Sequence, residues 1–342
     1  MKKPLFGKTL EQLKALVLEY QLPGFTAKQI ADWLYKKTIS SFDEMTNLSI
    51  KTRSVLNESF EIGLTQPSSV SISSDGTKKY LFPVNKGRFI EAAFIPDRER
   101  ATLCVSSQVG CRMGCRFCMT ARQGFQSNLT AGEIVNQVRS LPEREQLTNI
   151  VYMGMGEPLD NFQNVMQSLE ILTSDWGFAM SPRRITVSTI GIIGSMTKFL
   201  ESSECHLAVS LHSPFDEERR MLMPVQNNHP IEEVLNVIRN YDLGRQRRVS
   251  FEYIMFKGMN DTPRHVNQLA RILNGIRCRI NIIRFHPIPD APYQTSDKQT
   301  IQKFIEALNK KGITTTLRAS RGQDIEAACG LLSTKELLKA ND

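Results

Sequence analysis

Three cysteines lie close together in the segment 111–118 and could bind a metal centre. Cys111, Cys115 and Cys118 follow a Cys-x3-Cys-x2-Cys spacing around Gly114, and thiolates so close together can converge on one soft metal centre. A structural zinc site usually takes four protein ligands in two pairs, and no partner pair occurs at a suitable spacing. Three ligands to a four-iron cluster leave one iron open to bind and reduce a substrate or cofactor. Packed or zinc-binding cysteines are the alternative, although packing gives cysteines no reason to cluster in a loop.

Further polar residues lie where predicted strands end. The segment 154–158 follows a predicted strand and contains Gly156, which lets the backbone approach a ligand, and Glu157, whose carboxylate can bind an ammonium group. Later strand ends supply further candidates for cofactor binding: Ser188, then Ser210, Leu211 and His212, and finally His286. One such residue alone is more often a satisfied structural group, but their repeated position at strand ends favours a ligand-binding role.

The elements that must position these residues are strands and helices in alternation. Strands are predicted at 101–106, 149–153, 184–188, 206–211, 249–256, 280–285 and 313–317. Helices are predicted between them, at 130–141, 161–173, 193–201, 231–241, 262–273 and 297–311. This alternation predicts an α/β fold with a parallel sheet, and about six such units fit a partial (β/α)6 barrel of the TIM type. Chemistry in such barrels lies at the carboxyl ends of the strands.

The chain before residue 101 has a different pattern. Residues 1–65 are predicted to form a small helical accessory domain, because apolar residues recur at three- and four-residue steps from Leu10 to Tyr20 and Pro23-Gly24 ends that helix. Residues 66–100 are predicted to form a β-hairpin extension with runs at 71–84 and 88–95. The barrel then takes residues 101–342, including a C-terminal segment that carries Cys329.

Composition and charge exclude several classes of protein. The chain has 342 residues, of which 41% are hydrophobic, so disorder is not expected. No apolar run approaches the about 20 residues of a membrane helix, and the first residues lack the apolar stretch of a secretory signal. We therefore expect no membrane association and a cytoplasmic protein whose seven cysteines stay reduced.

Basic residues exceed acidic ones, 43 to 35, which gives a net charge of +8 and is compatible with a polyanionic partner. One group of arginines is expected near the mouth of the barrel: Arg112, Arg116, Arg122, Arg318 and Arg321. Other groups are Arg245, Arg247 and Arg248, and Lys36 with Lys37. Each could contact phosphates in a salt-sensitive way, or form solubilising surface.

The cysteine spacing, with Phe117 before the third cysteine, resembles the radical S-adenosylmethionine (SAM) superfamily. That resemblance implies a [4Fe-4S] cluster on Cys111, Cys115 and Cys118 with SAM on the fourth iron. The segments 103–108, 118–125, 154–159 and 321–330 are similar to those of the RlmN/Cfr family of radical adenosine methyltransferases that act on RNA. Residues 122–125 resemble the RlmN branch, which methylates C2 of adenine, more than the Cfr branch, which methylates C8. His286 departs from the asparagine of some relatives.

The resemblance implies how two further cysteines act. Adenine C2 is electrophilic and does not attack a sulfonium methyl group, so the family uses two SAM molecules per turnover. The first methylates Cys329, and the second yields the 5′-deoxyadenosyl radical, which abstracts hydrogen from that methyl group. The methylene radical adds to C2, Cys104 resolves the adduct through a disulfide with Cys329, and Glu91 is the implied proton acceptor.

The resemblance also implies the partners: 23S rRNA at the peptidyl-transferase centre, tRNA at the adenosine 3′ of the anticodon, and a low-potential electron donor such as flavodoxin. We expect a monomer. Two alternatives remain. One is a C8-adenosine rRNA methyltransferase of the Cfr type that confers antibiotic resistance. The other is a non-catalytic iron–sulfur or zinc RNA-binding protein, which would leave Cys104 and Cys329 without a task.

Overall fold

The computed structural model describes residues 2–37, 39–244, 249–328 and 330–334. Its centre is a ten-stranded sheet in the order β14-β13-β12-β11-β10-β9-β6-β5-β4-β3. Seven consecutive strands of this sheet are parallel. They are β6 (Arg100–Cys104), β9 (Asn149–Tyr152), β10 (Ile185–Thr189), β11 (His206–Ser210), β12 (Val249–Met255), β13 (Cys278–Arg284) and β14 (Thr314–Leu317). Strands β14 and β3 form its two edges.

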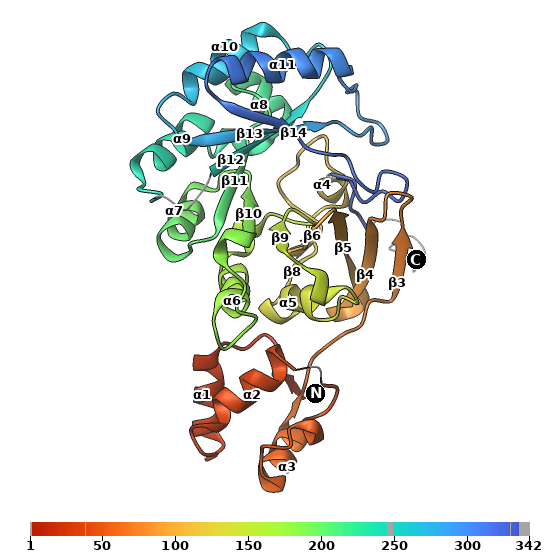
Figure 1. The fold of residues 1–342 in the computed structure, drawn as a ribbon, viewed down its shortest axis with the longest axis vertical. Coiled ribbons are helices and arrows are strands. Elements are labelled where there is room, and N and C mark those ends of the chain that lie inside the picture. Colours follow the sequence, from red (N-terminus) through yellow and green to blue (C-terminus); the bar gives the residue numbers. More distant parts are fainter. Residues whose placement is uncertain (1, 38, 245–248, 329, 335–342) are drawn as a thin grey trace.

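Helices connect the parallel strands and cover one face of the curved sheet (Figure 1). They are α5 (Ala131–Arg139), α6 (Phe162–Thr173), α7 (Ile193–Ser202), α8 (Asp216–Leu222), α9 (Ile231–Asn240), α10 (Pro263–Ile272) and α11 (Lys298–Lys310). The strand and helix alternation predicted from the sequence is confirmed, and with it the α/β partial barrel. The short helix α8 was not predicted.

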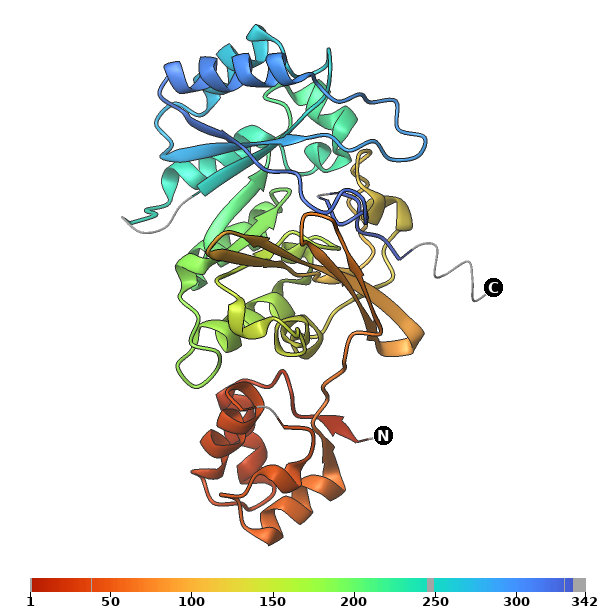
Figure 2. The same ribbon diagram turned by 45° about the vertical axis from the view of Figure 1, so that its right-hand side comes forward.

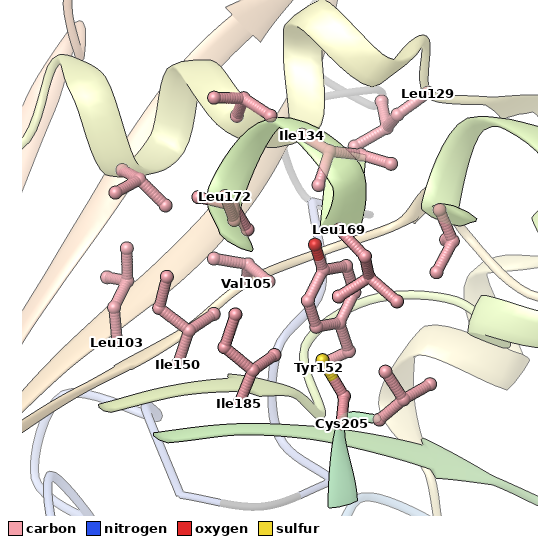
Figure 3. Packing of buried hydrophobic residues seen from close by; sticks show 14 of the residues in the cluster. Leu103, Val105, Leu129, Ile134, Ile150, Tyr152, Leu169, Leu172, Ile185 and Cys205 are labelled. Carbon is pink, nitrogen blue, oxygen red and sulfur yellow. The ribbon is translucent and has the colours of Figure 1, made fainter. Parts of the chain in front are cut away.

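Side chains alternate between the two faces of the barrel strands. On β12, Val249, Phe251 and Tyr253 belong to the main hydrophobic core, whereas Ser250 and Glu252 point to the inner face and line a cavity. This period of two follows from the pleat of a strand. Figure 3 shows the same core where strands meet α5 and α6, with Cys205 packed among the apolar side chains.

Three antiparallel strands extend the sheet beyond β6: β3 (Ser69–Ile72), β4 (Lys78–Val84) and β5 (Arg88–Asp97). The β-rich run predicted over 71–84 contains two strands, β3 and β4. A turn at Asp75-Gly76 divides the run, because the Asp75 side chain accepts a hydrogen bond from the Thr77 amide (2.9 Å) and Gly76 has a φ of +83°. Residues 85–87 connect β4 to β5, between the two runs that the sequence pattern indicated.

The N-terminal helices α1 (Leu10–Glu19), α2 (Thr26–Tyr35) and α3 (Ile50–Ser59) lie below the barrel (Figure 2). Helix α1 contacts α6 through Gln12 and Gln167, and α2 contacts α5 through Leu34 and Arg139. Thr9 caps α1 by accepting the Gln12 amide. The ring of Tyr35 contacts that of Trp176 edge-on at 5.8 Å between centroids, so the helices share the barrel's core. No helix among the described residues is long and apolar enough to cross a membrane.

Candidate active site

The three clustered cysteines face one cavity at the carboxyl ends of the barrel strands. They lie on the loop between the short strand β7 (Gln108–Val109) and helix α4 (Met119–Gln123). We call this cavity the cluster cavity. Its lining includes Cys104, Cys111, Cys115, Cys118, Gly156, Glu157, Ser188, Ser210, His212, Glu252, Arg318, Ala328 and Gly330. The structure therefore brings together residues that the sequence separates by more than 200 positions.

The thiols fit an iron–sulfur cluster by their chemistry. Burial raises the pKa of Cys111 to about 12 and that of Cys115 well above its usual range, and the neighbouring thiol of Cys118 raises both further. Such thiols stay neutral until a positive metal centre stabilises the thiolates. Among the described residues, no three His, Cys, Asp or Glu side chains are oriented to hold a single metal ion. Three thiols around one cavity nevertheless form the donor set that [4Fe-4S] clusters use, in which each iron takes its own thiolate.

The loop after β9 brings a glycine turn and a buried carboxylate to the cluster cavity. Gly156 has a φ of +99°, and a Cβ atom there would lie 2.5 Å from Gln108 Cβ, so only glycine fits. The Glu157 carboxylate accepts hydrogen bonds from the amides of Leu159 (3.1 Å) and Ile190 (3.0 Å). Burial raises the pKa of Glu157 to about 7 despite these bonds. A cationic or N–H-bearing ligand would stabilise its ionised form.

The ends of β10 and β11 supply the opposite side of the cluster cavity. Ser188 and Ser210 are half-buried in its lining, and His212 follows in a left-handed conformation with a φ of +55°. His212 Nδ1 accepts the Ile254 amide at 3.1 Å, and the Phe117 ring packs edge-on against the imidazole. Burial lowers the pKa of His212 to about 3, so the ring is neutral and its Nε2 carries the proton.

Two of the predicted cofactor-binding residues lie elsewhere. The Leu211 side chain is fully buried in the main hydrophobic core and is not in the lining of the cluster cavity. His286 lines a second cavity, where its Nδ1 forms a hydrogen bond with Gln323 Nε2. Burial lowers the pKa of His286. Contact of either residue with SAM stays a prediction.

Cys104 and the chain on both sides of Cys329 meet at the cluster cavity. Cys104 ends β6, is buried, and packs with Ala327. Ala328 and Gly330 line the same cavity, and the Gly330 carbonyl accepts the first amide of α4, that of Met119, at 2.8 Å. Cys329 itself lies outside the described residues. Gly330, the residue after Cys329 in the chain, is therefore held at the start of α4.

Glu91 lies on β5, and its carboxylate is already engaged. Lys79 Nζ lies 3.0 Å from Oε1, and the Ser333 amide donates to Oε2 at 2.9 Å. Burial raises the pKa of Glu91, and the charge of Lys79 opposes that rise. Glu91 is not among the lining residues of the cluster cavity, although it contacts the segment that follows Cys329. Its role as proton acceptor stays a prediction.

Arg219 on α8 is a site residue that the sequence reasoning missed. It is fully buried, and its Nη2 donates to the carbonyls of Ile190 (2.8 Å) and Ser210 (3.2 Å). Ile190 directly follows β10, and Ser210 is the last residue of β11. Burial lowers the pKa of Arg219 to about 10, whereas nearby Cys115 raises it. The guanidinium thus fixes two loops of the cluster cavity. No signal in the sequence distinguishes it from an arginine on the exposed face of a helix.

Glu252 on β12 was also missed. Only 3% of it is exposed, and it lines both the cluster cavity and the second cavity. Its Oε1 accepts hydrogen bonds from Ser250 Oγ (3.0 Å) and Asn281 Nδ2 (2.8 Å). The sequence did contain a signal for it. Strands of a parallel sheet are usually apolar on both faces, and Ser250 and Glu252 put polar side chains on one face of this strand.

Some of the basic residues predicted near the mouth already have acidic partners. Arg112 Nε lies 3.0 Å from Asp160, and Arg321 Nη2 lies 3.2 Å from Asp97. The second predicted group, Arg245, Arg247 and Arg248, lies outside the described residues. The positive charges of Arg112 and Arg321 are therefore partly neutralised within the protein.

The open barrel and its three-cysteine cavity define a radical SAM enzyme. Residues 105–270 match the sequence model of the Radical SAM superfamily, and residues 3–62 match that of the ribosomal RNA large subunit methyltransferase N-terminal domain. Enzymes of this superfamily use a [4Fe-4S] cluster and SAM. A crystal structure of a radical SAM methyltransferase from Sphaerobacter thermophilus superimposes with a TM-score of 0.90 at 39% identity, covering 96% of this chain and 99% of that one.

The chain belongs to the RlmN family. It is 56% identical over 333 residues to a probable dual-specificity RNA methyltransferase RlmN of Parabacteroides distasonis, with 97% of each chain covered. It is 44% identical to the dual-specificity RNA methyltransferase RlmN of Syntrophus aciditrophicus, with 96% of each covered. The family and the fold class predicted from the sequence are confirmed.

Proposed function

We propose that this protein is a radical SAM methyltransferase that methylates C2 of an adenosine in 23S rRNA and C2 of the adenosine 3′ of the anticodon in tRNAs. One observation carries the proposal: Cys104 and the residues flanking Cys329 line the same cavity as the three clustered cysteines. The names of the relatives add the two RNA classes. Neither a plain iron–sulfur protein nor a polar methyltransferase needs two more cysteines at such a cavity.

In this proposal Cys111, Cys115 and Cys118 hold the cluster, and Gly156, Glu157, Ser188, Ser210 and His212 surround SAM. When bound, the cluster and SAM supply a radical able to abstract hydrogen from a methyl group. Glu157 accepts a hydrogen bond from the amino group of SAM. The neutral His212 ring keeps its Nε2–H available as a donor because its Nδ1 is committed to the Ile254 amide.

The two cysteines complete the transfer, with two SAM molecules used per turnover. Cys329 would take a methyl group from the first SAM and then lose a hydrogen atom from that group to the radical supplied by the second SAM. The methylene radical would add to C2, and the odd electron left when the C2 proton departs would return to the oxidised cluster held by Cys111, Cys115 and Cys118, which leaves Cys329 linked to C2 through a methylene group. Cys104 Sγ then bonds to Cys329 Sγ as the bond between sulfur and the methylene carbon breaks. Its electron pair stays on that carbon, which takes up a proton and becomes the methyl group. Glu91 accepts the C2 proton, and a cellular thiol reduces the disulfide.

The remaining assignments of the proposal concern partners. Residues 1–65 act as an RNA-binding accessory domain, which the match of residues 3–62 supports. A low-potential donor such as flavodoxin supplies the electron. The protein acts as a monomer in the cytoplasm, where thiols can reduce the disulfide that each turnover leaves.

Cysteine variants test the proposed chemistry. Anaerobically reconstituted Cys329→Ala is expected to give neither methylated RNA nor a protein–RNA adduct, and Cys104→Ala is expected to trap a covalent adduct. Cys278→Ala, half-buried at the start of β13 and away from the cluster cavity, is the matched control and should methylate normally. Normal turnover of Cys104→Ala without trapped RNA would refute the resolving role of Cys104.

A further inference from the structure

The inner face of this open barrel carries polar side chains, whereas the interior of a closed (β/α)8 barrel is filled with apolar ones. Thr186, Ser250, Glu252, Asn281 and Thr316 occupy alternate positions on four strands and all line one cavity. The sheet register pairs Glu252 with Asn281 and Asn281 with Thr316, so these side chains form a ladder across three strands. A parallel sheet with such an inner face is built to meet a polar ligand.

The cavity next to this ladder is rich in arginine. We call it the arginine cavity, and it has a volume of about 470 Å³, within the range of ligand sites. Its described lining contains five arginines, Arg100, Arg183, Arg279, Arg318 and Arg321, and no lysine. Only two carboxylates, Asp97 and Glu252, oppose them, and Asp97 is paired with Arg321. The excess of positive charge fits a polyanion.

The arginine cavity adjoins the cluster cavity. Both are lined by Met153, Glu252, Arg318, Ala327 and Ala328. Ala328 precedes Cys329 in the chain, so a group bound at the junction lies beside the segment that carries the proposed methyl-transferring cysteine. The arginine cavity extends from this junction toward the starts of the strands, at Asn149 and His206.

Glu252 at the junction has an unmet hydrogen-bonding requirement. Its Oε1 takes bonds from Ser250 and Asn281, but its Oε2 is buried and has no hydrogen-bond partner among the described residues. An ionised carboxylate only accepts hydrogen bonds, and a buried oxygen left without a donor is costly. The missing partner is therefore a donor, such as an amine or a hydroxyl, that enters from one of the two cavities.

We propose that the arginine cavity receives the RNA strand around the target adenosine. Its arginines contact the flanking phosphates, and Glu252 Oε2 accepts a hydrogen bond from the nucleoside, either from the exocyclic amine of adenine or from a ribose hydroxyl. This inference rests on the proposed RNA methylation and adds the path by which the nucleotide reaches the cluster cavity. Phosphate contacts of this kind add affinity and salt dependence, and the carboxylate adds selectivity.

The arginines are tested by RNA binding to the full-length protein without reductant. The probe is a fluorescein-labelled RNA hairpin with an adenosine in its loop, and Kd is measured by anisotropy from 50 to 200 mM KCl. Arg183→Gln and Arg279→Gln are each expected to weaken binding and to reduce the slope of log Kd against log salt by about 1. Arg271→Gln on α10, exposed and outside both cavities, is the control. A wild-type slope in both cavity variants overturns the proposal.

Glu252 is tested with three hairpins that carry adenosine, inosine or 2′-deoxyadenosine at the target position. Inosine lacks the amine and deoxyadenosine lacks the 2′-hydroxyl, so the hairpin that wild-type protein binds about tenfold more weakly identifies the donor. Glu252→Gln is expected to bind the adenosine hairpin about tenfold more weakly and to lose that preference, with an unchanged Kd for SAM. Glu252→Asp, which keeps the charge, should retain part of the preference.

Two results would contradict the assignment of Glu252. One is a Glu252→Gln variant with wild-type RNA affinity and preference. The other is a Glu252→Gln variant that binds SAM more weakly but RNA normally, because the hydrogen-bond donor to Glu252 Oε2 would then belong to SAM. A failure of the proposed function is separate, because RNA that binds with arginine-dependent affinity but is never methylated refutes the reaction and leaves the binding path intact.

Discussion

Replacing Glu157 with glutamine is expected to remove a pH dependence from stability and from cofactor binding. In the folded protein without cofactor, burial raises the pKa of Glu157 from 4.5 to about 7. At about 1.36 kcal/mol per pKa unit, ionising the buried carboxylate costs roughly 3 kcal/mol more than ionising it in water. Because the folded pKa is the higher one, Glu157 contributes stability below about pH 4.5 that is lost as the pH rises through 7.

The measurable quantity is the difference between wild type and Glu157→Gln. Glutamine does not titrate, so the unfolding free energy of wild type should fall by roughly 2 to 3 kcal/mol relative to the variant between pH 5 and pH 8. The glutamine amide also faces a backbone donor, at Leu159 or Ile190, which costs the variant stability at every pH and leaves the slope unchanged. Chemical denaturation of cluster-free protein gives this difference.

Ionisation of Glu157 lowers the stability of the folded protein but should strengthen SAM binding. If SAM binds the ionised carboxylate, the ratio of the variant's Kd to the wild-type Kd should rise about tenfold from pH 6 to pH 8, since protonation competes with SAM near the wild-type pKa. The ratio isolates Glu157 because both reconstituted proteins meet the same ligand. Glu232→Gln, exposed on α9, is the control. A constant ratio together with a constant stability difference would refute the reasoning.

Three further predictions concern residues around the cluster cavity. Gly156→Ala should destabilise the protein by more than about 1 kcal/mol in chemical denaturation and lower SAM cleavage, because a left-handed φ meets a Cβ contact of 2.5 Å with Gln108; unchanged cleavage would show that the turn adapts. Arg219→Lys should lose about 3 kcal/mol of unfolding free energy, because lysine does not span both carbonyls, and a Kd for SAM equal to wild type would contradict its positioning role. Lys79→Met should raise the pKa of Glu91 and move the acidic limb of the pH–rate profile to higher pH, and an unmoved limb would argue against Glu91 as the proton acceptor.

The barrel could be predicted because its strands and helices are local patterns. Apolar runs and helical periodicity placed all seven parallel strands. The rule that chemistry lies at strand carboxyl ends singled out Gly156, Glu157 and Ser210, which line one cavity; their contact with SAM stays a prediction. The same rule does not say which individual side chains at a strand end face the cavity. Leu211 stands between two residues of the cluster cavity, but successive side chains of an extended chain point to opposite sides, and it enters the core.

The parts that could not be predicted depend on tertiary packing. Arg219 donates hydrogen bonds to two carbonyls at different strand ends, and nothing local to α8 encodes that contact. Glu91 contacts Lys79 and Ser333 because the C-terminal segment returns to the edge strands, a contact over 242 positions. The arginine cavity collects side chains from the starts of several strands and from the segment after β14, and each of these side chains alone resembles ordinary surface.

Product identity tests the central claim most directly. The protein would be reconstituted anaerobically and given reductant, SAM and either unmodified 23S rRNA or unmodified tRNA, and nucleosides would be identified by mass spectrometry against 2-methyl- and 8-methyladenosine standards. We predict 2-methyladenosine in both RNAs. 8-Methyladenosine would contradict the C2 assignment, and the absence of any methyladenosine despite an intact cluster would contradict the methyltransferase function itself.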